Sequence, residues 1–131
     1  MEELSLSDLK YDIQGIIENY IDNLFKWKEK IIMIQTLTGH FWITFDNGYQ
    51  ISIFNGYGSY SENHFNYELI KDEDVKLNGI RSKNCEVAVI YKPSGKFATK
   101  TFIDDLEDDV KGYISVNELV DLINKVKNYK D

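Results

Sequence analysis

The chain has 131 residues, 43% of them apolar and 14% aromatic, and a net charge of −7. This length and apolar content predict a single folded domain over residues 1–131 rather than a disordered segment. The acidic balance argues against nonspecific binding to nucleic acid or to an anionic membrane, because Lys and Arg drive such binding. The negative charge is compatible with a protein partner that has a basic surface.

Cysteine usage and the amino terminus predict a cytoplasmic protein. Cys85 is the single cysteine, so an internal disulfide and a cysteine-rich zinc site are excluded. A lone thiol suits a reducing cytoplasm. The opening MEELSLSDLK is acidic and lacks the apolar core of a signal peptide. No run reaches the roughly 18 apolar residues that would predict a membrane-spanning helix.

Apolar residues at helical spacing predict a first helix over about residues 6–28, with Ser5 and Asp8 as a capping box. A β-prone run follows at 31–34. Asn47-Gly48 then predicts a hairpin between strands 40–46 and 49–54. With a two-residue loop, Trp42 would lie opposite Ile53, and both faces of the hairpin would be apolar. The first helix would cover one face, and the C-terminal helix, another subunit or a partner would cover the second.

The second half of the chain predicts more strands and a last helix. Alternation indicates a weak strand at 65–69, a strand at 85–91 and, after the turn at 93–95, a strand at 96–102. Ser115 and Glu118 form a capping box before a helix that runs to about residue 127. The fold class is therefore α+β, an antiparallel sheet of about five strands flanked by an N-terminal and a C-terminal helix.

Residues 51–67, ISIFNGYGSYSENHFNY, have the composition of a recognition loop. Tyrosine supplies a large amphipathic contact area, while Ser, Gly and Asn supply adaptable hydrogen bonds. The candidate contact residues are Tyr57, Tyr60, His64 and Tyr67. The alternative is that the glycines serve turns while the aromatic rings pack over the sheet edge. The Gly-x-Gly of this stretch matches neither a P-loop nor a dinucleotide fingerprint.

A dense run of acidic residues forms the second candidate contact region. It consists of Asp104, Asp105, Glu107, Asp108 and Asp109. These carboxylates could imitate nucleic-acid phosphates and meet a basic protein surface, or they could form a solvated loop.

Metal binding and catalysis have weaker support. Residues 107–118 match an EF-hand at Gly112 and Glu118, but Lys111 falls where an oxygen ligand should stand, so a turn before a capped helix is favoured. Catalysis needs a nucleophile within reach of a base, and no spacing places His40, His64 or Cys85 together. We expect no catalytic, cofactor-binding or metal site.

Three segments carry motifs that occur together elsewhere: NGYQISIFNGYGSYSENH, CEVAVIYKPSGKF and DDVKGYISVNELVDLINKV. They resemble a widespread family of small phage and prophage proteins. Members of that family carry a Gly-x-Gly-x-Tyr loop, a Glu-Val-Ala strand and an Asp-Asp-Val-x-Gly-Tyr segment before a C-terminal helix. The resemblance implies a phage origin and places a family function at residues 55–60 and 108–113.

Small acidic phage proteins without a catalytic constellation are often antagonists of bacterial immunity, an analogy of class. We therefore expect a non-enzymatic, anti-CRISPR-like inhibitor in the host bacterial cytoplasm. It would bind a nucleic-acid-binding defence effector through the acidic and aromatic residues without touching nucleic acid itself. One alternative is an oligomeric sponge for a small nucleotide immune signal, joined through the second apolar sheet face, with Arg81 or a lysine meeting phosphate. Another is a small hydrolase that uses His64.

Overall fold

The computed structural model describes residues 12–23, 26, 30–71 and 80–130. They form an antiparallel sheet with an N-terminal and a C-terminal helix, which confirms the predicted α+β class. In chain order the elements are α1 (Ile13–Asp22), β1 (Ile31–Leu37), β2 (His40–Phe45), β3 (Tyr49–Phe54), the 3-10 helix η3 (Tyr67–Ile70), β4 (Asn84–Tyr91), β5 (Lys96–Phe97), α3 (Thr99–Phe102), β6 (Lys111–Ser115) and α4 (Val116–Lys127).

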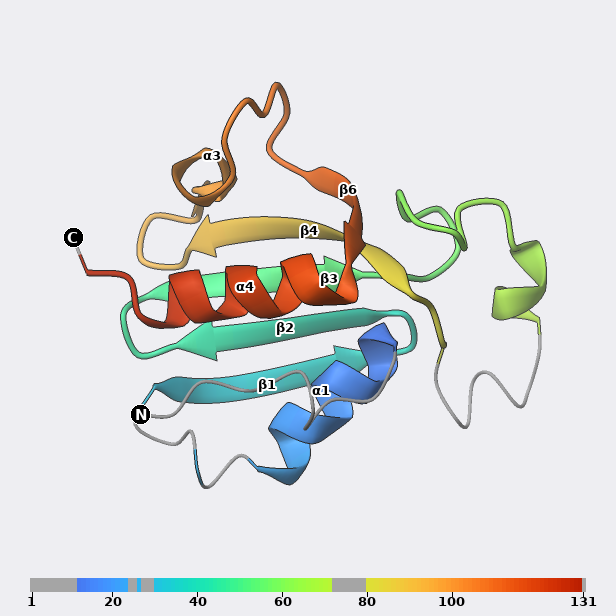
Figure 1. The fold of residues 1–131 in the computed structure, drawn as a ribbon, viewed down its shortest axis with the longest axis horizontal. Coiled ribbons are helices and arrows are strands. Elements are labelled where there is room, and N and C mark those ends of the chain that lie inside the picture. The colour runs from blue at the N-terminus through green and yellow to red at the C-terminus, as the bar shows by residue number, and fades with distance from the viewer. Residues whose placement is uncertain (1–11, 24–25, 27–29, 72–79, 131) are drawn as a thin grey trace.

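The sheet follows the chain from β1 through β2 and β3 to β4 (Figure 1). Two strands then share the outer edge of β4. β5 pairs with its end at Ile90 and Tyr91, and β6 pairs with its beginning, from Asn84 to Val87. β1 therefore lies at one end of the sheet, and β5 and β6 lie at the other.

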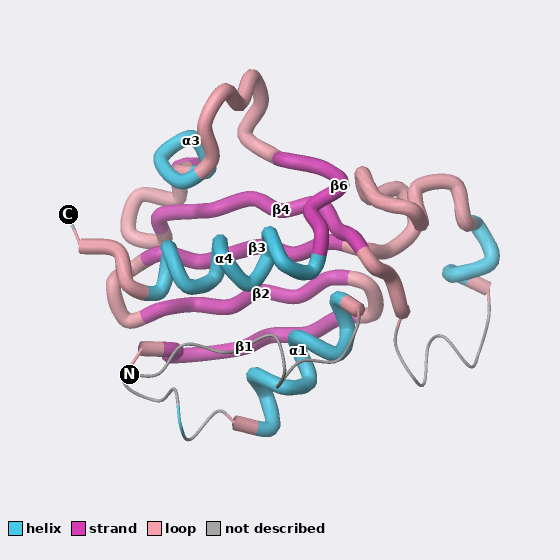
Figure 2. Tube along the Cα trace, in the orientation of Figure 1, coloured by secondary structure: helices cyan, strands magenta, loops and turns pink. Residues whose placement is uncertain are grey.

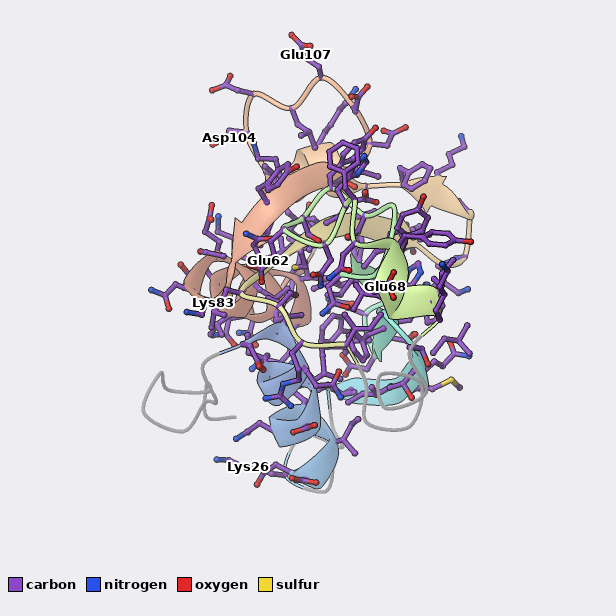
Figure 3. The ribbon with its side chains drawn as sticks, turned by 90° about the vertical axis from the view of Figure 1, so that its right-hand side faces the viewer. Lys26, Glu62, Glu68, Lys83, Asp104 and Glu107 are labelled. Carbon is purple, nitrogen blue, oxygen red and sulfur yellow. The ribbon has the colours of Figure 1, made fainter. Side chains whose placement is uncertain are left out.

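Both long helices cover the same face of the sheet, as Figures 1 and 3 show. Odd-numbered residues of β2, β3 and β4 point to this face because side chains alternate along a strand. They pack against one stripe of α1 and one stripe of α4. The central members of this core are Ile16, Ile17, Phe41, Ile43, Phe45, Ile51, Ile53, Val87, Val89, Leu119, Ile123 and Val126.

The predicted register of the β2–β3 hairpin is wrong by one residue. Trp42 pairs with Ser52, not Ile53, because three residues, 46–48, make the turn instead of two. The side-chain amide of Asn47, in this turn, donates to the carbonyls of Val126 and Tyr129 at 2.7 and 3.0 Å, at the end of α4. A one-residue shift exchanges the faces of a strand. One face is therefore wholly apolar, and the other is mixed rather than a second apolar face.

The first helix is shorter in the described residues than the predicted 6–28. α1 begins at Ile13, and Asp12 is its N-cap, which accepts the Gly15 N–H at 2.8 Å. The helix ends at Asp22, and the chain turns at Asn23. The predicted capping box at Ser5 and Asp8 lies outside the described residues.

Two further strand predictions are wrong. Residues 65–69 form turns and η3, because local backbone bonds such as Tyr67 N–H to the Phe65 carbonyl curl this segment. The strand predicted at 96–102 ends after Phe97, and α3 follows. The strand ends here because the Thr99 hydroxyl accepts the Val89 N–H at 2.9 Å. This side-chain oxygen takes the place of the backbone carbonyl that a longer β5 would offer to β4.

Candidate functional site

The loop at residues 55–67, here the aromatic loop, is built around buried polar side chains. The Ser59 hydroxyl donates to the Gly56 carbonyl at 2.7 Å and lies 2.6 Å from the Ser61 hydroxyl. Asn63 donates to the Asn55 carbonyl at 2.8 Å. All these side chains are buried, and buried polar groups that are bonded specify one conformation. Ser59, Ser61, Asn55 and Asn63 therefore shape the loop from within rather than contacting a partner.

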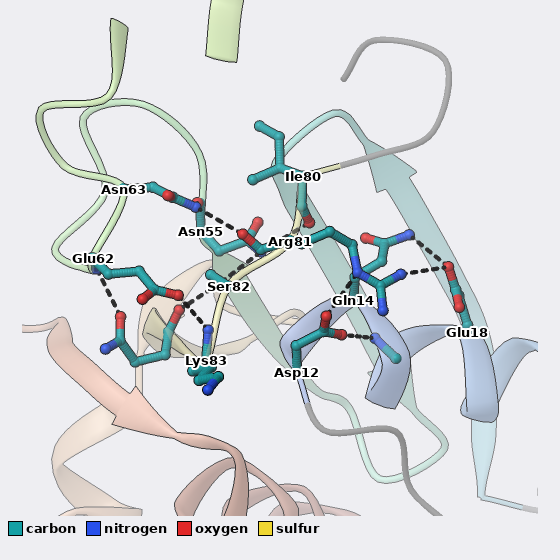
Figure 4. Close-up of polar contacts among 12 residues, drawn as sticks. Asp12, Gln14, Glu18, Asn55, Glu62, Asn63, Ile80, Arg81, Ser82 and Lys83 are labelled. Atoms are coloured by element: carbon teal, nitrogen blue, oxygen red, sulfur yellow. Dashed lines mark hydrogen bonds and ion pairs between the residues drawn. The ribbon is translucent and has the colours of Figure 1, made fainter. Parts of the chain in front are cut away.

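The aromatic loop is also pinned to residues 80–83, as Figure 4 shows. Asn55 donates to the Ser82 hydroxyl at 2.9 Å, and Asn63 donates to the Arg81 carbonyl at 3.3 Å. The Glu62 carboxylate accepts the Lys83 N–H. These bonds tie a loop that follows β3 to the segment that enters β4, so the loop has a fixed position on the sheet.

The tyrosines of the aromatic loop are left on the outside. Tyr57 and Tyr60 are 42% and 51% exposed, and Tyr67 is exposed to a similar degree. Tyr57 packs edge-on against Tyr67 with ring centroids 5.4 Å apart, and Tyr60 stacks on His64 at 5.5 Å. Such amphipathic rings are the side chains that dominate binding at protein interfaces. The predicted contact residues Tyr57, Tyr60, His64 and Tyr67 therefore lie together.

β6 pairs with β4 and is hydrogen-bonded to the aromatic loop on its other side. Its pairing with β4 contains an irregularity, and there Tyr113 adopts a left-handed backbone with φ of 54°. The Tyr113 N–H donates to the Tyr60 carbonyl at 2.8 Å. Tyr113 is exposed. Non-glycine residues held at positive φ are strained, and such strain gathers at functional sites.

The acidic loop, residues 104–109, leads directly into β6. Asp104, Asp105, Glu107, Asp108 and Asp109 are all exposed. Figure 3 shows the side chains of Asp104 and Glu107 pointing away from the sheet. The base of the loop is fixed, because the buried Thr99 hydroxyl donates to the Asp109 carbonyl at 2.6 Å. The five carboxylates therefore project from an anchored loop into solvent.

The structure brings the two predicted contact regions to opposite sides of one strand. In Figure 2 the aromatic loop and the acidic loop flank β6. We call the exposed aromatic and acidic residues of these two loops, together with Tyr113 of β6 and the half-buried His64, the β6 surface; Tyr60 is the member of the aromatic loop that contacts β6 directly. Its members are Tyr57, Tyr60, His64, Tyr67, Asp104, Asp105, Glu107, Asp108, Asp109 and Tyr113.

A small hollow lies beside the acidic loop, between α3, β6 and α4. Its volume is about 240 Å³, and Phe102, Ile114 and Leu122 form its apolar part. The carboxylates of Asp104, Glu118 and Asp121 line it, together with the amines of Lys111 and Lys125. This mixture suits the apolar stem and charged head of a long basic side chain.

The metal and catalytic candidates do not form sites in the described residues. Lys111–Ser115 is a strand, so the loop of an EF-hand is not formed there. No group of three His, Cys, Asp or Glu side chains could hold a metal ion in this part of the chain. Cys85 is buried in β4, and burial raises the pKa of its thiol, so it stays protonated and unreactive.

Neither histidine completes a catalytic arrangement. His64 Nδ1 lies 2.9 Å from the Ser59 carbonyl, a contact that orients the ring within the aromatic loop. His40 Nε2 lies 2.7 Å from the Ser52 hydroxyl on the sheet face opposite α1 and α4. A serine nucleophile also needs a third group that orients the histidine. Among the described residues, no carboxylate bonds the other ring nitrogen of His40.

Arg81, the candidate phosphate contact, faces α1 instead. Its guanidinium lies 2.7 Å from the Asp12 carboxylate and 3.5 Å from that of Glu18 (Figure 4). Two carboxylates therefore already balance its charge. This arrangement favours a structural role for Arg81 over phosphate binding.

Comparisons of the chain with protein-family models, with curated proteins and with solved structures find no match. None of the described helices is long and apolar enough to cross a membrane. The function of the site is therefore inferred from its geometry.

Sequence reasoning missed Tyr113 and Phe65 as surface residues. Phe65 is 88% exposed beside His64, with ring centroids 4.4 Å apart. Period-two alternation assigned it to a strand, where half of the side chains would be buried. Tyr113 lies within residues 108–113, the segment in which the sequence predicts a family function, and this was the one signal available for it.

Proposed function

We propose that this chain is a phage-encoded, non-enzymatic inhibitor that binds a bacterial defence protein and covers its nucleic-acid-binding surface, as an anti-CRISPR protein does. The β6 surface would make the contact. Support comes from one observation above all: an anchored acidic loop and an anchored cluster of exposed tyrosines flank the same strand. The phage origin rests on the resemblance over roughly residues 47–127.

The two halves of the β6 surface would have different tasks. Five exposed carboxylates attract a basic surface at long range and raise the association rate. The tyrosines supply close contact, and their truncation would mainly raise the dissociation rate. A basic side chain of the partner would enter the hollow beside Asp104. A surface that binds nucleic acid is itself basic, which makes it the matching partner.

The test is binding to a panel of purified nucleic-acid-binding defence effectors, CRISPR effectors among them, measured over a series of salt concentrations. We expect binding to one member to weaken as salt rises, and nucleic acid to compete with it. In the variant Asp104→Asn/Asp105→Asn/Asp108→Asn/Asp109→Asn, the association rate should fall by about tenfold or more. Tyr60→Ala should instead raise the dissociation rate.

A matched control changes the same number of charges elsewhere. Asp22→Lys/Asp46→Lys raises the net charge by the same four units at two exposed carboxylates that lie outside both the β6 surface and the hollow. Only a general effect of net charge would slow this variant as strongly. Binding that is indifferent to the four acidic-loop substitutions, or that persists in excess nucleic acid, would overturn the proposal.

A further inference from the structure

β1 has an open edge with unusual composition. Among the described residues it pairs with β2 alone, so the backbone N–H and C=O groups on its other side have no strand partner. Its sequence, IIMIQTL, contains no charge and no proline. Ile32 and Leu37 are 63% and 66% exposed. Natural sheets protect their edges with lysine, proline, very short strands or β-bulges. This seven-residue edge has none of the first three, and its one irregularity lies between Ile31 and Met33, at the start of the strand.

The outward backbone groups of β1 follow from its hairpin with β2. Leu37 and His40 flank a two-residue turn and therefore form a hydrogen-bonded pair. Hydrogen-bonded and non-bonded pairs alternate along an antiparallel ladder. Counting back from Leu37, Ile34 and Thr36 direct their N–H and C=O groups away from β2. The open edge thus offers regularly spaced donors and acceptors near the middle of the strand.

We propose that two copies of this chain pair through β1, antiparallel about a two-fold axis, to make one continuous sheet. Placing the axis at Ile34, the middle residue of the strand, sets Ile32 opposite Thr36 and Met33 opposite Gln35. At the axis, the outward Ile34 N–H of each copy then meets the Ile34 carbonyl of the other. The contact is isologous, so the same residues serve both copies.

The distribution of charge favours a second copy as the occupant. The chain carries a net charge of −7, so two copies repel each other across most of their surfaces. The edge of β1 is a neutral strip in which no like charges meet. The acidic loop lies beyond β4, at the opposite end of the sheet from β1 (Figure 1). Pairing through β1 therefore keeps the two acidic loops far apart and leaves both β6 surfaces uncovered.

The experiment is the molar mass in solution, from size-exclusion chromatography with light scattering over a range of concentrations. The wild-type chain should show twice its mass of 15.3 kDa. Ile32→Lys/Thr36→Lys and Ile32→Glu/Thr36→Glu should each reduce it to the monomer mass, because like charges face each other. An equimolar mixture of the two variants should restore the dimer mass, which an unfolded chain could not do.

The control Phe65→Lys/Phe97→Lys makes the same change at two exposed apolar residues far from β1 and should remain dimeric. The proposal is overturned if the wild-type chain is a monomer at every concentration, or if the mixture of lysine and glutamate variants stays monomeric. It stands independently of the proposed function, because it concerns the opposite end of the sheet and is read by mass, not by binding of another protein.

Discussion

Gly112 lies directly against Tyr60. A Cβ built on this glycine would stand 2.6 Å from the Cβ of Tyr60 and 3.1 Å from its carbonyl oxygen. The next residue, Tyr113, donates its N–H to that same carbonyl. The aromatic loop and β6 therefore meet at this contact. A glycine here allows the aromatic loop to approach β6 closely enough to form the β6 surface.

Gly112→Ala should lower the free energy of unfolding by about 1–3 kcal/mol, because the added methyl group forces Tyr60 or β6 to move. Urea denaturation measures this loss. Gly58→Ala is the control. No atom lies within 4 Å of its added Cβ, and its φ is 87°. The cost of Gly58→Ala is therefore backbone strain only, about 1–2 kcal/mol.

A double-mutant cycle isolates the contact between the two residues. Tyr60→Gly removes the Cβ that the new methyl group would meet. The combined cost of Tyr60→Gly and Gly112→Ala should therefore be smaller than the sum of the single costs. Simple additivity would show that this contact does not limit the approach of the loop to β6.

Asn63→Ala should loosen the aromatic loop. The substitution removes the donors to the Asn55 and Arg81 carbonyls, and each buried acceptor left unpaired costs about 1–3 kcal/mol. Hydrogen exchange across residues 55–67 should accelerate, while exchange in β2 should change little. Asn66→Ala replaces an exposed asparagine of the same loop and should leave exchange unchanged. Equal protection in the two variants would contradict the network.

Thr99→Val should release the base of the acidic loop. The hydroxyl is lost from a buried position, where it accepts the Val89 N–H and donates to the Asp109 carbonyl. We expect a loss of about 1–3 kcal/mol in the free energy of unfolding, together with faster exchange near Asp109. Thr101→Val makes the same change at an exposed site of α3 and should cost little. A comparable cost for both threonines would remove Thr99 as the anchor.

His40 should make stability depend on pH near neutrality. Its ring stacks on Trp42 with centroids 3.9 Å apart, and burial lowers its pKa below the ordinary value of 6.5. At a pH between the folded and unfolded values the unfolded chain binds the proton more readily. The free energy of unfolding should therefore fall as pH drops below about 6.5.

Urea denaturation at several pH values from about 5 to 8 measures this dependence, over the range where an ordinary histidine titrates. His40→Gln should flatten the curve, whereas His64→Gln should leave the contribution of His40 in place. If the free energy of unfolding of His40→Gln depends on pH as strongly as that of the wild-type chain, another group titrates in this range.

Residues whose roles are local were predicted well. The capping box of Ser115 and Glu118 is present at the start of α4, because a cap involves residues three apart in the chain. β2, β3 and β4 occupy their predicted ranges, because alternation and turn residues act over a few positions. The α+β class follows from the order of these elements.

Only the tertiary structure decided the register of the β2–β3 hairpin. Asn47-Gly48 is the strongest local signal for a two-residue turn. Instead Asn47 lies within a three-residue turn, where its Oδ1 accepts the Tyr49 N–H at 3.1 Å while its amide donates to the carbonyls of Val126 and Tyr129, which are distant in sequence. With the shifted register, one face of the hairpin is wholly apolar and the other is mixed. The second apolar face that was predicted to join copies of the chain is therefore not formed.

The sequence by itself determined β2, β3, β4 and α4, the acidic and aromatic composition of the contact regions and the absence of an internal disulfide. The tertiary structure decided that these regions flank one strand, that Asn55, Ser59, Ser61 and Asn63 are internal, and that β1 is left at an edge. The physical reason is that composition and periodicity report on neighbours along the chain. The contacts between Tyr60 and Gly112, or between Thr99 and Asp109, depend on how separate strands pair.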